Sequence, residues 1–267
     1  MKITSISNGR IKRLRSLYKK KYRRIEGAFV LEGVRIIEEA CKEDALIEEV
    51  FYSDYLLRNQ RGKDLLEKLK SKRVDVIEVS DKVLAEVSDT QSPQGILAVV
   101  KKVEYDLEDI VNGDENFLLV VDGVQDPGNL GTIIRTADAA GVAGIITTKG
   151  TVSLYNQKTI RATMGSLFRL PVYRENDLGN LKKILKDNKV RVIVGDIGGD
   201  KYHFDVDYID SVALIVGNEG KGPRAELIEF ADEVIKIPLV GDAESLNVAM
   251  ATGVIVYEGV RQRLTKN

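Results

Sequence analysis

Residues 117–141 have the pattern of a buried strand that leads into a polar turn and then into a helix. Phe117 to Val121 are all apolar, and the Asp126-Pro127-Gly128-Asn129 stretch after them has turn chemistry. From residue 132 to residue 140 apolar side chains recur at helical spacing, and Gly141 follows where a helix would end. A strand followed by a polar loop and a helix is the unit from which α/β folds are built.

Two later stretches have the same organisation. Residues 212–216 form an apolar run that leads directly into Gly217-Asn218-Glu219-Gly220, and residues 234–238 lead into a loop that contains Glu244-Ser245. A helix rich in small residues is predicted after that loop, over 247–257. Open parallel sheets bind ligands at the carboxyl ends of their strands, so we expect these three loops to form one site.

These stretches resemble, in this order, the motifs of the SpoU (TrmH-type) family of RNA ribose 2′-O-methyltransferases, within the SPOUT superfamily. Each motif is weakly specific alone, whereas the three together at these spacings are highly specific. The matching residues of the three motifs are Asn129, Gly131 and Arg135-Thr136-Ala137; Gly217-Asn218-Glu219-Gly220-Lys221-Gly222; and Ile237-Pro238, Gly241 and Ser245-Leu246-Asn247-Val248.

The resemblance implies a C-terminal SPOUT α/β domain with a deep trefoil knot and S-adenosylmethionine as the methyl donor. By the family's pattern, the expected cofactor-binding residues are Thr147, Gly217, Ile237 and Leu246, which would act largely through main-chain groups. The expected catalytic residues are Arg135, Asn129, Glu219, Ser245 and Asn247.

Arg135 is the residue that the family proposes as activator of the ribose hydroxyl. A guanidinium rarely releases its proton, so we favour stabilisation of the forming oxyanion, with the proton passing to phosphate or water. General-base action by Arg135 remains an alternative. A purely structural ion pair with Asp138 or Glu219 is another.

The first 25 residues contain ten Lys and Arg residues and no acid. Such a segment can neutralise an RNA backbone, although a solvated helix face is the alternative interpretation. Apolar residues at helical spacing predict one amphipathic helix over 8–22. The expected RNA-binding residues are Arg10, Lys12, Arg13, Arg15, Lys19, Arg23, Arg24 and Glu32.

The N-terminal part alternates predicted strands (28–31, 47–52, 74–79, 96–100) with predicted helices (34–41, 62–70, 81–87). Phe29 to Gly33 resembles the substrate-binding domain of many SpoU proteins, a small ribosomal-protein-like α/β sandwich. The acidic, turn-rich residues 101–116 are interpreted as the linker. We therefore expect an RNA substrate-binding domain over 1–108 and the methyltransferase domain over 109–267.

The second half continues the alternation, which predicts a mostly parallel sheet covered on both faces. Strands are expected at 144–147, 171–173 and 190–194, and helices at 156–167 and 178–187. Residues 195–199 follow a strand and are Gly-rich, but they lack the G-x-G-x-x-G spacing of a dinucleotide loop.

The chain has one cysteine, Cys41, and one histidine, His203, which argues against a Cys/His metal site and against an internal disulfide. With no predicted membrane span or signal peptide, we expect a cytoplasmic protein without metal. Cys41 lies far from the motifs, which excludes covalent base methylation. His203 is interpreted as a loop histidine.

The resemblance also implies a homodimer through the C-terminal domain, with RNA as the partner. An N-terminal extension of this kind favours 23S ribosomal RNA over tRNA as substrate. A tRNA 2′-O-methyltransferase, a non-catalytic RNA-binding protein and a Rossmann-like enzyme acting on a small nucleotide are the alternatives.

Overall fold

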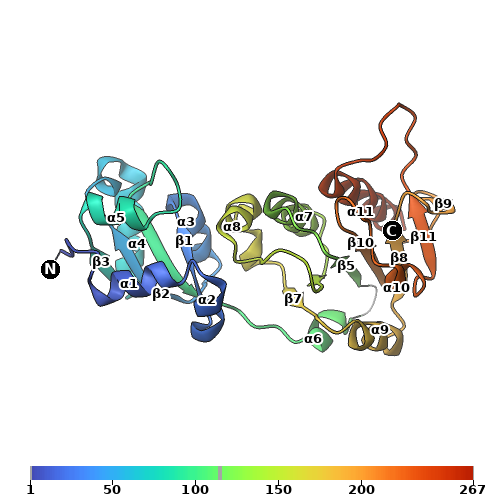
Figure 1. Ribbon diagram of the computed structural model, residues 1–267, viewed down its shortest axis with the longest axis horizontal. Coiled ribbons are helices and arrows are strands. Elements are labelled where there is room, and N and C mark those ends of the chain that lie inside the picture. The colour runs from blue at the N-terminus through green and yellow to red at the C-terminus, as the bar shows by residue number, and fades with distance from the viewer. Residues whose placement is uncertain (1, 114–115, 267) are drawn as a thin grey trace. The chain divides into compact units, whose positions relative to one another are not determined.

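The computed structural model describes residues 2–113 and 116–266, and the chain divides into two compact units. The first unit contains the chain up to Val103 together with Tyr155–Arg161, and the second contains Glu104–Leu154 and the residues after Arg161. Figure 1 shows both units, with elements labelled where there is room.

The first unit is built on a mixed four-stranded sheet of order β1-β4-β2-β3. β4 is antiparallel to β1 and β2, whereas β2 and β3 are parallel. Its strands are β1 (Ala28–Glu32), β2 (Ile47–Tyr52), β3 (Asp75–Glu78) and β4 (Ile96–Lys101). Its helices are α1 (Gly9–Ser16), α2 (Lys20–Glu26), α3 (Val34–Lys42), α4 (Gln60–Ser71) and α5 (Asp81–Val87), with a short 3-10 helix η1 (Leu56–Arg58). Gln157 closes the free edge of this sheet by donating from its side chain to the carbonyl of Val30 at 2.9 Å.

The prediction of one helix over 8–22 was wrong, because α1 ends at Ser16 and α2 begins at Lys20. The turn between the two helices leaves carbonyls that need hydrogen-bond donors. The guanidinium of Arg23 donates to two of them, those of Leu17 at 3.1 Å and Tyr18 at 2.5 Å. The side chain of Leu17 is completely buried, so the turn adds an anchor to the core of the first unit.

The second unit contains a seven-stranded sheet of order β7-β6-β5-β10-β8-β11-β9. All of its strand pairs are parallel, which confirms the prediction of a mostly parallel sheet. Its strands are β5 (Phe117–Val121), β6 (Gly144–Thr147), β7 (Val172–Arg174), β8 (Arg191–Gly195), β9 (Lys201–Tyr202), β10 (Val212–Val216) and β11 (Glu233–Lys236).

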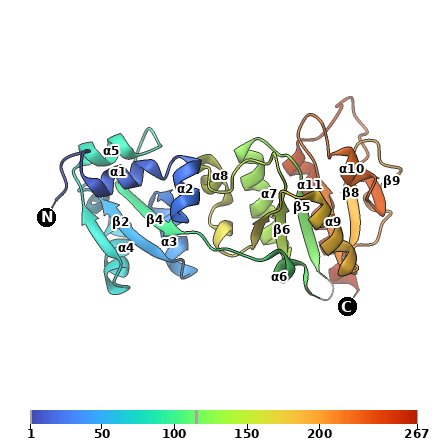
Figure 2. The same ribbon diagram turned by 60° about the horizontal axis from the view of Figure 1, so that its bottom comes forward.

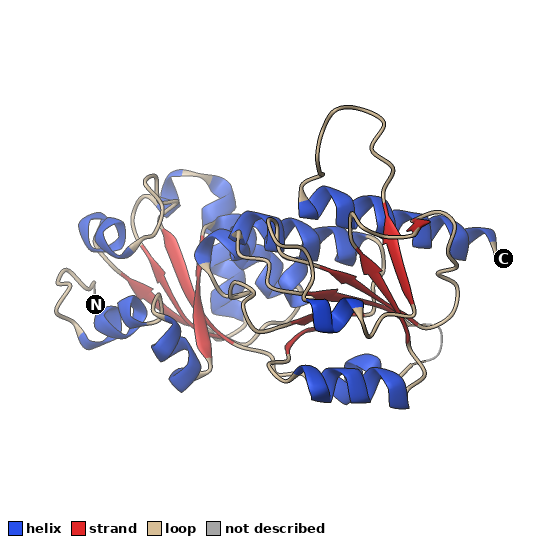
Figure 3. Cartoon of the chain, turned by 45° about the vertical axis from the view of Figure 1, so that its right-hand side comes forward, coloured by secondary structure: helices blue, strands red, loops and turns tan. Residues whose placement is uncertain are grey.

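Helices cover both faces of this sheet (Figure 3). Alternate residues of β5 point to opposite faces, so Leu119 packs with α7 (Pro127–Ala139) and α11 (Val248–Thr265), and Leu118 packs with the other helices. On that second face lie α6 (Leu107–Val111), α9 (Leu178–Asp187) and α10 (Ala225–Ile228) (Figure 2).

Two further expectations about the second half need correction. Residues 101–116 are not simply a linker, because α6 lies within them and buries Leu107, Ile110 and Val111; residues 114–115 lie outside the described chain. The helix expected over 156–167 is split into α8 (Gln157–Thr163) and a 3-10 helix η2 (Ser166–Phe168). Met164 and Gly165, with φ of 52° and 98°, adopt left-handed conformations that cannot continue an α-helix.

Among the described residues, no helix is both long and apolar enough to cross a membrane.

Candidate active site

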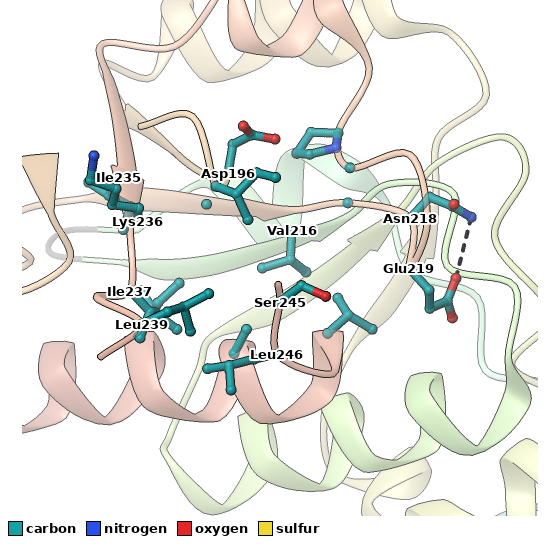
Figure 4. Close-up of a pocket in the computed structure, with 18 of the residues that line it drawn as sticks. Asp196, Val216, Asn218, Glu219, Ile235, Lys236, Ile237, Leu239, Ser245 and Leu246 are labelled. Atoms are coloured by element: carbon teal, nitrogen blue, oxygen red, sulfur yellow. Dashed lines mark hydrogen bonds between the residues drawn. The ribbon is translucent and has the colours of Figure 1, made fainter. Parts of the chain in front are cut away.

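A cavity of about 660 Å³ opens at the carboxyl ends of the central strands of the second unit. Its walls come from the loops after β8, β10 and β11 and from the first turns of α11 (Figure 4). Ile235, Ile237 and Leu246 form an apolar side, and the Gly217–Pro223 loop forms much of the rest. This volume is within the range of roughly 300–1,000 Å³ that is typical of small-molecule sites.

Gly217, at the end of β10, lies where two chain segments almost touch. A Cβ atom there would lie 2.0 Å from the nitrogen of Pro223 and 2.2 Å from the carbonyl carbon of Gly222, so only glycine fits. The turn is closed by paired main-chain hydrogen bonds between Asn218 and Gly222, at 3.1 and 3.0 Å. The Asn218 side chain also accepts from the amide of Gly220 at 3.0 Å, which makes Asn218 part of the loop's architecture.

The loop is fixed to the end of β5 by a buried ion pair between Asp122 and Arg224. The Asp122 carboxylate accepts from the amide of Arg224 at 2.9 Å, from its Nε at 2.9 Å and from Oγ1 of Thr148 at 2.5 Å. Burial alone would raise the pKa of Asp122, but the hydrogen bonds from Arg224 and Thr148 outweigh it and hold that pKa below its usual value. Asp122 therefore stays ionised and holds the loop that lines the cavity in place.

The helix that follows β5 begins earlier than the sequence indicated, because Asp126 is its N-cap and Pro127 its first residue. The side chain of Asp126 accepts from the amide of Asn129 at 2.9 Å, so the predicted turn is the first turn of α7. This change places Asn129 on a rigid helix rather than on a loop.

Glu219 joins the second motif to the start of α7. Its carboxylate accepts from the amides of Gln125 at 3.1 Å and Asp126 at 3.0 Å, and from Nδ2 of Asn129 at 3.1 Å. Partial burial would raise the pKa of Glu219, but these bonds, led by the one from Asn129, lower it. Glu219 is thus an ionised acceptor that binds the amides at the start of α7.

Asn129 also connects the first motif to the third. Its Oδ1 accepts from Nδ2 of Asn247 at 3.0 Å, and Oδ1 of Asn247 caps α11 by accepting from the amide of Ala249 at 2.9 Å. A continuous chain of hydrogen bonds therefore runs from Glu219 through Asn129 to Asn247. The structure brings the three predicted loops together, with Ser245 in the cavity wall.

Arg135 lies on the exposed surface of α7 and does not line the cavity. In the described chain it has no hydrogen bond or ion pair, since Asp138 pairs with Arg169 at 2.7 Å and Glu219 is bound as described above. The ion pairs considered for Arg135 are therefore not formed, and its guanidinium is available to another molecule.

Three of the four expected cofactor-binding residues, Gly217, Ile237 and Leu246, line the cavity. Thr147 does not, because β5 separates its strand β6 from β10, and its hydroxyl donates to the carbonyl of Tyr173 at 3.1 Å. Sequence reasoning also missed Asp196, which lines the cavity from the loop after β8. Its position at the end of a parallel strand was the signal that could have found it.

Two family models match this chain. Residues 116–257 match the model described as SpoU rRNA Methylase family, and residues 8–98 match the MRM3-like substrate binding domain. The chain belongs to the SpoU family.

Two similar proteins of known name support the assignment to the SpoU family. This SpoU chain is 36% identical over 255 residues to the 23S rRNA (guanosine(2553)-2′-O)-methyltransferase RlmP of Bacillus subtilis, covering 96% of this chain and 97% of that one. It is also 36% identical over 224 residues to the 23S rRNA (guanosine-2′-O-)-methyltransferase RlmB of Escherichia coli K12, covering 80% and 92%.

Solved structures confirm the α/β fold with its parallel sheet. The SpoU methyltransferase AviRb of Streptomyces viridochromogenes in complex with AdoMet superposes with a TM-score of 0.89 at 29% identity, covering 97% of this chain and 99% of that one. The AdoMet-bound rRNA methyltransferase of Sinorhizobium meliloti gives a TM-score of 0.87 at 33% identity, covering 98% and 97%.

The cations expected to contact RNA in this SpoU chain fall into two groups. In the described residues, Lys12, Arg15, Lys19 and Arg24 are exposed and have no ion-pair partner. The other three have partners. Arg10 pairs with Asp75, and Arg13 is held by Glu26, Glu48 and Glu49. Arg23 is buried and donates to the carbonyls of the turn after α1.

Two charged groups of the first unit have internal roles. Burial would lower the pKa of Arg13, but its carboxylate partners raise it above its usual value. Glu32 is buried and accepts from the amides of Asp89 at 2.8 Å and Thr90 at 3.3 Å. Glu32 thereby shapes the loop that precedes β4.

Proposed function

We propose that this chain transfers the methyl group of S-adenosylmethionine to a ribose 2′-hydroxyl of 23S ribosomal RNA. The decisive support is an arrangement in which the second and third SpoU motifs line one cavity and Asn129 of the first motif is hydrogen-bonded to Glu219 and Asn247. It occurs in a chain that aligns over 96% of its length with a 23S rRNA guanosine-2′-O-methyltransferase. The enzyme class follows from the family, and the RNA follows from the named relatives.

The cavity suits S-adenosylmethionine, which supplies an electrophilic methyl group on a sulfonium. The apolar side formed by Ile235, Ile237 and Leu246 matches an adenine ring, and we assign main-chain contacts to Gly217, Ile237 and Leu246. Gly217 has no Cβ to obstruct the approach of the ligand or of the neighbouring loop.

The catalytic residues have to orient the hydroxyl and stabilise it as it loses its proton. Ser245 and Asn247 are assigned as hydrogen-bond donors to the phosphate or hydroxyl groups beside the methyl. Asn129 and Glu219 act as positioning residues, because their hydrogen bonds fix Asn247 and the Gly217–Gly222 loop. Arg135 stabilises the oxyanion and grips the adjacent phosphate, since a guanidinium keeps its proton at neutral pH.

We include a homodimer in the proposal because it would bring Arg135, the proposed catalytic cation, to a cavity. Arg135 does not line the cavity of its own chain. On α11, Met250, Val254 and Tyr257 are spaced along one face and are 62%, 39% and 50% exposed. α7 packs against α11, so a partner seated on this strip would approach both helices. A dimer would bury the strip and let Arg135 reach the partner's cavity.

We assign RNA recognition to the substrate-binding domain over residues 1–108 and catalysis to residues 109–267. Lys12, Arg15, Lys19 and Arg24 are free to contact phosphates, with Arg10 beside them, whereas Arg13, Arg23 and Glu32 contribute through the shape of the binding surface. The proposal also includes the deep trefoil knot of the SPOUT fold at the loops around Gly217 and Gly241, and the cytoplasm as the location of the ribosomal substrate.

Thermal unfolding with candidate ligands tests the cofactor part of the proposal. A ligand at 100 times its Kd stabilises the native state by about 2.7 kcal/mol. S-adenosylhomocysteine should therefore raise the melting temperature, and NAD should leave it unchanged. A rise with NAD alone would favour the Rossmann-like alternative and contradict the assignment.

A further inference from the structure

Asp196 lines the cavity and has one carboxylate oxygen that is not used within the described chain. Its Oδ1 accepts from the amide of Gly198 at 2.8 Å, whereas its Oδ2 has no hydrogen-bond or ion-pair partner in the described part of the chain. Gly222 leaves that oxygen accessible, because a Cβ on Gly222 would lie 2.9 Å from it. Oδ2 of Asp196 is therefore able to accept a hydrogen bond from a ligand.

The other two carboxylates that line the cavity differ from Asp196. Glu219 is already bound by amides and by Asn129, and Glu244 is exposed on the loop after β11. Asp196 is half-buried at the end of β8, a central strand of the sheet. Its position is thus fixed more rigidly than that of Glu244, and its acceptor capacity is freer than that of Glu219.

The cavity places Asp196 between two different surroundings. In Figure 4 it lies between Ile235 and Lys236 on one side and Asn218 and Glu219 on the other. The apolar side suits adenine, and the Glu219 side contains the motif residues assigned to methyl transfer. The ribose of S-adenosylmethionine lies between its adenine and its sulfonium, and carboxylates are common partners of ribose hydroxyls in nucleotide sites.

We propose that Asp196 binds the ribose hydroxyls of S-adenosylmethionine and makes the site selective for a donor with an intact ribose. This inference rests on the proposed function, because it takes S-adenosylmethionine as the occupant of the cavity. Asp196 is a binding residue in it and takes no part in proton transfer.

Calorimetric titration of the full-length protein with S-adenosylhomocysteine tests the inference. Asp196→Asn keeps an oxygen for the amide of Gly198 and removes the charge, so Kd should rise by about 10- to 100-fold, as for loss of a hydrogen bond to a charged group. The matched control is Asp200→Asn, an exposed carboxylate of the same loop that does not line the cavity, and its Kd should equal that of the wild type.

Analogues separate ribose recognition from general damage. For the wild type, the 2′- and 3′-deoxy forms of S-adenosylhomocysteine should bind about 10-fold or more weakly than the parent, and in Asp196→Asn this difference should disappear. An analogue lacking the α-amino group should lose the same factor in both proteins.

The outcomes are distinct. Equal weakening of all ligands in Asp196→Asn, or no weakening, overturns the inference. If Asp196→Asn loses only its selectivity against the analogue without the α-amino group, the inference is also overturned, because Asp196 would then bind the ammonium group of the ligand. If the wild type binds none of these ligands, the proposed function fails and the inference falls with it.

Discussion

Replacing Asp122 by asparagine removes the charge that fixes the Gly217–Gly222 loop to the end of β5. Asp122 is only 1% exposed, and every group that contacts its carboxylate is a donor: the amide and guanidinium of Arg224 and the hydroxyl of Thr148. An asparagine must point its NH₂ group at one of these donors. The substitution therefore creates an uncompensated buried polar contact as well as a broken ion pair.

The expected loss of unfolding free energy depends on how deeply Asp122 and Arg224 are buried. Removing one partner of a buried ion pair costs about 3–5 kcal/mol, and here the Arg224 side chain, 39% exposed, can recover part of its hydration. We therefore expect a loss of about 2–3 kcal/mol in unfolding free energy, which corresponds to a fall of about 4–12 °C in melting temperature. Denaturant unfolding and calorimetry measure both quantities.

Thr148→Val is the matched control, because it removes one hydrogen bond and leaves the ion pair intact, at an expected cost of about 1 kcal/mol. S-adenosylhomocysteine should bind more weakly to Asp122→Asn than to this control. If Asp122→Asn unfolds with a free energy within about 0.5 kcal/mol of the wild type, the loop is not held by this ion pair.

The same substitution should change the dependence of stability on pH. The pKa of Asp122 is lower in the folded chain than its unfolded value of about 3.9, so its contribution is fully present above that value. That contribution is lost as the pH falls through the folded pKa. The stability difference between wild type and Asp122→Asn should thus be larger at neutral pH than in acid, and a constant difference would argue against an ionised Asp122.

Three further substitutions test other parts of the account. Gly217→Ala should abolish binding of S-adenosylhomocysteine, because its Cβ would lie 2.0 Å from the nitrogen of Pro223; calorimetric binding at the wild-type level would contradict this packing. Val254→Asp should convert the proposed dimer to monomers in sedimentation, since it would bury a charge in the α11 strip. An unchanged dimer would locate the interface elsewhere. Arg15→Ala should weaken RNA binding and reduce the salt slope by about one unit, whereas an unchanged slope would exclude a phosphate contact by Arg15.

The parallel sheet was predictable because central strands such as β5 and β10 are continuous apolar runs. β5, β6 and β10 have the predicted limits, since a strand buried on both faces requires apolar residues throughout. Their loops could be placed at one site for the same reason, because parallel strands end at a common edge.

Where the same residue types are compatible with two local structures, the sequence could not decide between them. Asp126 and Pro127 fit a turn and equally fit a helix N-terminus, so the earlier start of α7 depended on tertiary contacts such as the one from Asp126 to Glu219. The break between α1 and α2 depended on Arg23, whose charge indicated a surface residue but whose guanidinium is buried.

Asp196 was missed because its surroundings come from distant parts of the chain. The Gly-rich stretch around it was tested only against the dinucleotide-loop spacing, which it lacks. Its access to the cavity depends on Gly222, which lies in another loop. A contact between two loops that are distant in the sequence cannot be predicted from the residue spacing within one of them.

Methyl transfer from labelled S-adenosylmethionine to bulk ribosomal RNA, with bulk tRNA in parallel and Arg135→Ala as the variant, tests the central claim most directly. We predict label in 23S RNA at a position that resists alkaline cleavage, and at least a 100-fold loss of rate in the variant, about 2.7 kcal/mol of transition-state stabilisation. Label in tRNA alone would overturn the substrate, and the absence of label in either RNA despite cofactor binding would contradict the assignment as a ribose methyltransferase.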